Sequence, residues 1–313
     1  GEELVDWHRQ EGLDTFEQYF GMRPVGCWPS EGGVSAAALQ KLEDHGFTWA
    51  ASGESVFRHS QANKENASLA GGSLYQGFTV AGGELACFFR DDGLSDLIGF
   101  TYSDWHADDA VANLIEHLEN IAASTRGQEN PLVSIILDGE NAWEHFPENG
   151  YYFLNTLYQR LSEHADLKMT TYSDYLATAR NQPDIKRLVS GSWVYGTFST
   201  WIGDRDKNRG WDMLGDAKKV FDQTVAENEL SGDQLLAARH QLSICEGSDW
   251  FWWFGDYNSA DTVSDFERLY RVHLSNLYTM LGKEPPEYLS TVFAHGGGSP
   301  AQSGVMRKGQ YAG

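Results

Sequence analysis

The spacing of hydrophobic and polar positions predicts alternating strands and helices in the first part of the chain. A short apolar run over 24–28 precedes a helical pattern over 34–45, and a second apolar run follows over 47–51. Such alternation is typical of βα units built around a parallel sheet or barrel. We therefore expect an α/β fold from about residue 25 to about residue 171.

A nearly continuous apolar and β-branched run over 132–137 predicts a further strand, buried on both faces. Helical spacing is found over 107–124 and 151–164. Residues 73–89 are typical of a hairpin that turns over 81–84, and we expect this hairpin to interrupt the βα alternation.

The pattern changes after residue 183. Three long helical segments, at about 210–228, 232–245 and 262–282, follow one another without intervening strands. This indicates a helical region appended to the α/β part. The end of the chain, from 295 onward, is rich in Gly and Ser and short of apolar residues, as in a linker.

Composition narrows the possible partners and the compartment. The formal net charge of the 313-residue chain is −22, and an acidic surface of that size repels phosphate backbones and anionic lipid headgroups. We expect no nucleic-acid and no membrane partner, and no apolar run is long enough for a transmembrane helix. The three cysteines, Cys27, Cys87 and Cys245, are far apart and odd in number, which favours a reducing compartment and a cytoplasmic location.

Two carboxylates directly follow predicted strands. Glu31 comes after the run over 24–28, Asp138 comes after the run over 132–137, and the two lie 138 − 31 = 107 positions apart. Catalytic groups of βα folds are found at such strand ends. Glycosidic bond cleavage needs one carboxyl to protonate the leaving oxygen and another to attack or to activate water. An acid after a strand can equally be a helix cap or a turn former, as in Asp138-Gly139.

Aromatic residues make up 13% of the chain, with 11 Trp. They concentrate in 245–256, where they alternate with acids, and in 191–204, just before a charged helical start. Flat rings beside hydrogen-bonding groups are typical of a sugar subsite. The same rings can serve to dock the helical region onto the sheet.

Four separated segments combine acidic and aromatic residues in unusual ways. They are GCWPSEGGVS (26–35), SIILDGENAWEHF (134–146), GSWVYGTFSTWIGDRDKNRGWDML (191–214) and CEGSDWFWWFGDYNS (245–259). Taken in this order, they resemble segments of glycoside hydrolase family 57, especially its amylopullulanase-like members.

The resemblance implies an incomplete (β/α)7 barrel followed by a C-terminal helical bundle. On this basis 1–182 would form a partial catalytic barrel, 183–290 a helical region that completes the cleft, and 291–313 a flexible tail. It also implies a retaining reaction on α-glucosidic links of starch, glycogen or pullulan. On the family's pattern, the nucleophile is the Glu of WPSEG, here Glu31, and the general acid/base is the Asp of LDGEN, here Asp138.

The same matching places further residues along the cleft: Trp28, Trp193, Glu246, Asp249 and Trp250. The expected ligand is an α-glucan oligosaccharide or polysaccharide. The resemblance implies no cofactor and no metal ligands, although bound calcium is possible, and it leaves the oligomeric state open. Retention requires the two carboxyl groups to lie only about 5–5.5 Å apart.

Three readings stay open, because the His-rich segment that begins the family's first barrel strand is not found in this sequence. The first is a retaining hydrolase. The second is a transferase, either a branching enzyme or a 4-α-glucanotransferase, which would share the covalent intermediate. The third is a non-catalytic glucan-binding fragment. A metal-dependent deacetylase or mannosidase is disfavoured, because the ten His are scattered without an HxH or HxxxH pair after a strand.

Overall fold

The structure is a computed structural model that describes residues 2–139, 143–179 and 181–298. Within these ranges the chain divides into two compact units. We call residues 9–198 the sheet unit, and residues 199–298 together with residues up to His8 the helical unit. Each unit is described by itself below.

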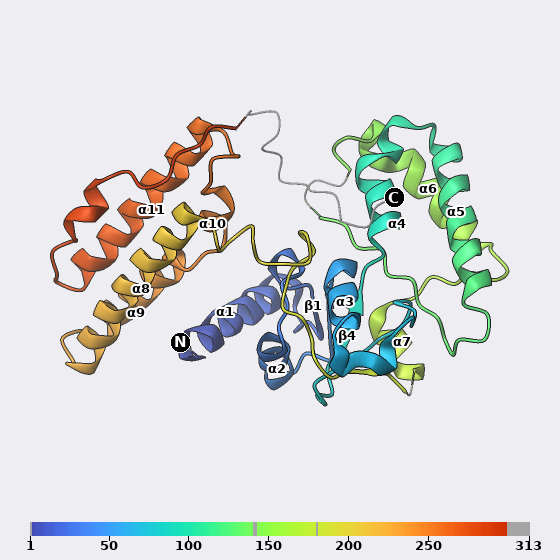
Figure 1. Cartoon of the computed structure of the whole chain (residues 1–313), viewed down its shortest axis with the longest axis horizontal. Coiled ribbons are helices and arrows are strands. Elements are labelled where there is room, and N and C mark those ends of the chain that lie inside the picture. The colour runs from blue at the N-terminus through green and yellow to red at the C-terminus, as the bar shows by residue number, and fades with distance from the viewer. Residues whose placement is uncertain (1, 140–142, 180, 299–313) are drawn as a thin grey trace. The chain divides into compact units, whose positions relative to one another are not determined.

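The sheet unit contains two small parallel sheets (Figure 1). The first joins β1 (Gly26–Cys27), β2 (Trp49–Ser52) and β4 (Ala86–Phe89) in the order β1-β2-β4. The second pairs β3 (Thr79–Val80) with β5 (Asp184–Ile185). The carboxyl ends of β1, β2 and β4 therefore meet at one edge of the first sheet, as the βα pattern predicts.

All three helices predicted in the sheet unit are present, with some shifted ends, and further helices accompany them. The α-helices that lie wholly or partly in it are α1 (Glu2–Phe20), α2 (Ala36–Asp44), α3 (Glu54–Gln61), α4 (Asp92–Phe100), α5 (Ala107–Ser124), α6 (Tyr151–Ser162) and α7 (Tyr172–Thr178). Short 3-10 helices are η1 (Ser30–Gly32), η2 (Lys64–Leu69), η3 (Tyr102–Asp104) and η4 (Pro147–Gly150). Sequence spacing located α2, α5 and α6 but not α1, α3, α4 or α7.

The prediction that a hairpin over 73–89 interrupts the βα alternation is wrong. Phe78 and Cys87 do form one antiparallel bridge, with both N–H groups donating to the opposite carbonyl. However, β4 lies beside β2 in parallel, and β3 leaves to pair with β5. The strand after the turn therefore continues the βα alternation, because its whole length finds a partner in β2.

The predicted strand over 132–137 is not present as a regular strand. Its backbone makes isolated hydrogen bonds: the N–H of Leu132 donates to the carbonyl of Tyr75, and the carbonyl of Ser134 accepts from the N–H of Asp91. Ser134 alone in this run is fully buried. The segment lies beside the end of β4 and forms no continuous ladder with it, so an apolar sequence is not sufficient for a strand here.

Alternate residues of β2 and β4 face two different cores. Ala50, Cys87 and Phe89 pack with residues of α2 and α3, whereas Ala51 and Phe88 pack with Tyr175 of α7. Successive side chains of a strand point to opposite faces, so both faces of the sheet are covered. A third core joins α4, α5 and α6 to the segment over 133–137.

The helical unit contains the three long helices that the sequence predicts. They are α8 (Arg205–Ala226), α9 (Gly232–Cys245) and α11 (Ala260–Met280), with the short α10 (Asp249–Trp253) and η5 (Glu287–Ser290) beside them. The helix α11 packs against both α8 and α9 (Figure 1). Lys207 of α8 is almost completely buried, and its ammonium donates to the carbonyls of Phe251 and Phe254. These bonds tie the middle of α10 and the residue that follows it to α8.

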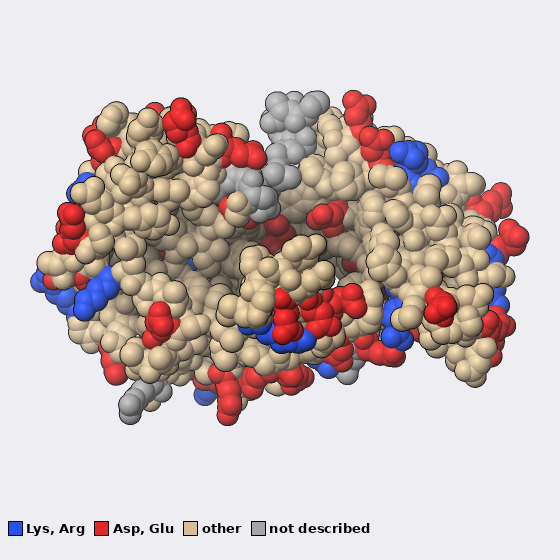
Figure 2. Space-filling model, turned by 180° about the vertical axis from the view of Figure 1, so that it is seen from behind, with Lys and Arg blue, Asp and Glu red and all other residues tan. Residues whose placement is uncertain are grey.

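Acidic side chains outnumber basic ones on the molecular face in Figure 2 and are spread widely over it. This distribution agrees with the net charge of −22. Among the described helices, none is long and apolar enough to cross a membrane.

Candidate functional site

Glu31 lies in a strained turn directly after β1. Its backbone has φ 54° and ψ 27°, in the left-handed region that side chains other than glycine rarely adopt. Two hydrogen bonds hold this turn: the Ser52 hydroxyl donates to the carbonyl of Gly32 (2.6 Å), and the N–H of Trp193 donates to the carbonyl of Glu31 (3.1 Å). Such strain concentrates at functional sites, where the surrounding structure imposes it.

The indole of Trp193 fixes the carboxylate of Glu31. Its Nε1–H donates to Glu31 Oε2 at 2.9 Å, and Trp28 packs edge-on against the same ring at 5.1 Å between centroids. The close fit of the backbone extends to Gly53, where a Cβ would lie 2.6 Å from Trp193 Cα. Residues 162 positions apart are therefore joined through one aromatic ring.

Asp138 lies near the same indole. It is half-buried and lines a narrow pocket together with Leu137, Trp193, Arg90 and Asp96. The indole of Trp193 bonds to Glu31, contacts Trp28 and lines the pocket that Asp138 also lines. It thus brings together four predicted site residues: Trp28, Glu31, Asp138 and Trp193 itself.

Arg90 and two aspartates complete this neighbourhood, and the sequence reasoning missed them. The Arg90 guanidinium lies 4.8 Å above the Trp193 ring, donates to Asp92 Oδ1 at 2.7 Å, and forms a second ion pair with Asp96. All three charged side chains are buried. The sequence does contain a signal for Arg90, because this residue directly follows the run 86–89, as the catalytic groups of βα folds follow their strands. The predicted hairpin assigned this run to an excursion from the βα units, so its end was not expected to carry a site residue.

Burial raises the pKa of Asp92 to about 6, and the nearby Glu54 and Asp96 carboxylates add to this effect. The guanidinium of Arg90 opposes it. Asp92 Oδ2 accepts no hydrogen bond within the described part of the chain. An ionised carboxylate in this position is therefore only partly compensated.

Glu246, Asp249 and Trp250 belong to the helical unit, where two of them make local contacts. Glu246 forms an ion pair with His8 at 2.9 Å. The indole N–H of Trp250 donates to the carbonyl of Ile244 at 2.8 Å, and its ring packs against three aromatic side chains, those of Phe266, Tyr270 and His273. Asp249 is exposed at the start of α10.

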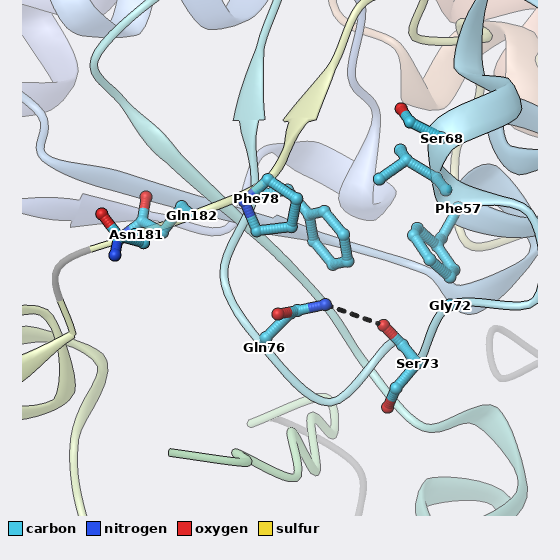
Figure 3. A pocket seen from close by; sticks show the side chains of 10 residues that line it. Phe57, Ser68, Gly72, Ser73, Gln76, Phe78, Asn181 and Gln182 are labelled. Carbon is cyan, nitrogen blue, oxygen red and sulfur yellow. Dashed lines mark hydrogen bonds between the residues drawn. The ribbon is translucent and has the colours of Figure 1, made fainter. Parts of the chain in front are cut away.

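A separate cavity of about 430 Å³ lies between α3, η2 and the segment around Gln76 (Figure 3). Phe57 and Phe78 lie at its base, and Gln76 donates to the carbonyl of Ser73 at its wall. None of its lining side chains is ionisable. It therefore offers no carboxyl, imidazole or amine for acid–base chemistry, unlike the surroundings of Trp193.

Across the three described ranges, no group of three or more His, Cys, Asp or Glu side chains is placed to hold a metal ion.

Comparison with known proteins was made in three ways. The sequence profile of glycosyl hydrolase family 57 matches residues 5–186. No significant match was found among curated protein sequences.

Several solved structures share the fold. A GH57 branching enzyme from Thermococcus kodakaraensis is 15% identical with a TM-score of 0.67, and 90% of this chain covers 62% of it. The α-amylase AmyC from Thermotoga maritima is 16% identical with a TM-score of 0.63, and 92% covers 66% of it. A 4-α-glucanotransferase from Thermococcus litoralis is 16% identical with a TM-score of 0.55, and 86% covers 44% of it. The chain thus spans less than two thirds of the length of each.

Proposed function

Because this chain belongs to glycosyl hydrolase family 57, we propose that it is a retaining enzyme acting on α-glucans, with Glu31 as nucleophile and Asp138 as general acid/base. The predicted resemblance to this family is confirmed by the match over 5–186. The substrate class, the two catalytic roles, and an incomplete (β/α)7 barrel with a C-terminal helical bundle are part of the proposal. So are the predicted domain limits at 182 and 290.

The reaction proceeds in two steps. In the first, Asp138 donates its proton to the glycosidic oxygen while a carboxylate oxygen of Glu31 forms a bond to the anomeric carbon, and the bond to the leaving sugar breaks. In the second, the Asp138 carboxylate removes a proton from the incoming hydroxyl, whose oxygen displaces Glu31 from the anomeric carbon. Two inversions give net retention.

The hydrogen bond from Trp193 to Glu31 is the observation that carries this proposal. It orients one carboxylate oxygen in a half-buried turn that local interactions alone would not stabilise. The same indole forms a wall of the pocket lined by Asp138. Two carboxyl groups that both lie near one fixed ring fit a double-displacement reaction, which needs them about 5–5.5 Å apart.

A transferase is the second candidate. A branching enzyme and a 4-α-glucanotransferase are among the structures of this fold. Hydrolysis and transfer differ only in whether water or a sugar hydroxyl resolves the glycosyl-enzyme. Trp28, Glu246, Asp249 and Trp250 would contact the glucan in either case, and they would influence which acceptor enters.

The test compares the parent with Glu31→Gln and Asp138→Asn on maltooligosaccharides and pullulan. Product anomers are followed by NMR, and reducing ends and chain lengths are followed by chromatography. We expect both variants to lose at least about 10³-fold in kcat, because each removes a reacting group. Asp109→Asn and Glu116→Gln, exposed carboxyls of α5, serve as controls that keep activity.

An aryl α-glucoside separates the two roles. Its leaving group needs no protonation, so the first step should recover in Asp138→Asn but not in Glu31→Gln. Accumulation of shorter and longer glucans without new reducing ends would indicate transfer. A parent that binds maltooligosaccharide without turnover would contradict the proposal and support the glucan-binding interpretation.

A further inference from the structure

Arg90 occupies the first position after β4 and is held rigidly there. Only 3% of its side chain is exposed. Its backbone N–H donates to the carbonyl of Ser52 at 2.9 Å, which continues the alignment of β4 with β2. Its guanidinium is fixed by Asp92 and Asp96, both on the first turns of α4. Two carboxylates on one guanidinium leave it little freedom to change direction.

The fixed guanidinium reaches the surroundings of both candidate catalytic carboxyls. Its Cζ lies 4.8 Å above the ring of Trp193, whose N–H donates to Glu31. Its Nη1 donates to the carbonyl of Ile136 at 3.3 Å, two residues before Asp138. The Asp138 segment has a further tie to α4, because the hydroxyl of Ser95 accepts from the N–H of Ile136.

A cation above an indole changes the indole as a donor. The guanidinium attracts the π-electron density of the ring, so the N–H becomes a stronger hydrogen-bond donor. That donor bonds to Glu31 Oε2, and hydrogen bonding to the charged form of a carboxyl favours that form. The effect of Arg90 on Glu31 therefore passes through Trp193, and its effect on Asp138 passes through the backbone at Ile136.

We propose that Arg90 is a positioning residue for the reaction: it orients Trp193 and the segment before Asp138, and through the indole it keeps the Glu31 carboxylate ionised. The proposal rests on the proposed function for the meaning of the two carboxyls. We therefore expect changes at Arg90 to alter kcat and the acid limb of the pH profile, which is the fall of kcat at low pH. We expect them to have little effect on substrate affinity.

The electrostatic surroundings of Arg90 set the design of the test. The carboxyls that face it come from α4 (Asp92 and Asp96), from α3 (Glu54) and from the segment ending in Asp138. Removing the cation alone would leave buried acids unpaired and could prevent folding. The informative variants are therefore R90K, which keeps the charge, and the triple variant R90M/D92N/D96N, which removes cation and partners together.

Arg209 offers a matched control. Its guanidinium also lies over an aromatic ring, that of Tyr288 at 4.7 Å, in the helical unit. The ring of Tyr288 has no N–H to donate, so R209M removes an arginine–aromatic contact without changing any of the charged partners named for Arg90. Circular dichroism and thermal unfolding establish that each variant is folded.

The measurement is the pH dependence of kcat and KM on a maltooligosaccharide. In the triple variant we expect kcat to fall about 10- to 100-fold, KM to change less than about threefold, and the acid limb to move up by about one pH unit. R90K should keep the acid limb near that of the parent and recover part of kcat. In a W193F background the acid limb should no longer respond to the Arg90 changes, because the indole N–H that transmits the effect is gone.

A second readout does not depend on turnover. With 5-fluorotryptophan incorporated, the ¹⁹F resonance of Trp193, assigned by its loss in W193F, should titrate with Glu31 and cease to titrate in E31Q. Its midpoint should move to higher pH in the triple variant and stay unchanged in R209M. If the parent is inactive but this shift occurs, the positioning role stands and the proposed function fails. A folded triple variant with the parent's midpoint and the parent's acid limb would overturn the proposal.

Discussion

Trp193 and Trp250 come from similar sequence surroundings, and both are predicted to line a cleft, yet the structure uses their indoles differently. In the sheet unit, the Trp193 N–H donates to the carboxylate of Glu31 and a guanidinium covers its ring. In the helical unit, the Trp250 N–H donates to a backbone carbonyl and aromatic side chains surround its ring. Composition alone does not distinguish these two uses, because both satisfy the same donor.

The buried cations of the two units differ in the same way. Arg90 is surrounded by ionisable groups and an indole that contacts a candidate nucleophile. Lys207 is surrounded by backbone carbonyls and the ring of Tyr257. A cation bound to carbonyls joins chain segments, whereas a cation bound to carboxylates also sets the local field. The difference indicates a reactive environment in the sheet unit and a packing role in the helical unit.

The largest effect on stability is expected from Lys207→Met. The ammonium donates to the carbonyls of Phe251 within α10 and of Phe254 just after it, and a thioether cannot replace this donor. We expect the free energy of unfolding to fall by about 3–5 kcal/mol. Guanidinium denaturation followed by circular dichroism measures it, and Lys219→Met, 80% exposed, should change less than about 0.5 kcal/mol. Equal effects at the two lysines would remove the contrast drawn here.

A pH effect is expected from Asp92. Its pKa of about 6 in the folded protein lies above the value of about 3.9 for an unfolded chain. The folded state therefore binds this proton more tightly, and Asp92 contributes stability that is fully present below about pH 4 and lost as pH rises through about 6. The loss amounts to about 2–3 kcal/mol.

Asp92→Asn checks this sign. The difference in unfolding free energy between the parent and the variant should change by that amount between pH 4 and pH 7, in favour of the variant at the higher pH. Urea denaturation at several pH values gives the difference. A pH-independent difference would show that the pKa of Asp92 is the same in the folded protein and in the unfolded chain.

The smallest effects test the tryptophan comparison directly. Trp193→Phe removes the N–H that holds Glu31, and we expect kcat to fall about tenfold, which corresponds to about 1.4 kcal/mol. Trp250→Phe should leave kcat within about threefold and instead lower the free energy of unfolding by about 1–2 kcal/mol. Steady-state kinetics and thermal unfolding of both variants are needed. A tenfold loss in kcat for Trp250→Phe would show that the reaction depends on the Trp250 N–H and not only on its aromatic ring.

Several features followed from the sequence by itself. The helices α5 and α9 begin and end where the apolar spacing predicts, because helical periodicity is a local property of the chain. The family was identified from four short segments, and the first two contain Glu31 and Asp138. The location of Glu31 directly after a strand also followed, since β1 lies within the predicted run over 24–28.

Other features were decided only by the tertiary structure. Whether an apolar run becomes a strand depends on a neighbour along its whole length, which β4 finds in β2 and the run over 132–137 does not find. The grouping of Trp193 with Glu31, and of Trp250 with aromatic side chains, depends on contacts between distant segments. So does the role of Arg90, because a charged residue acquires its partners only when burial excludes water and the fold brings α4 and Trp193 to it.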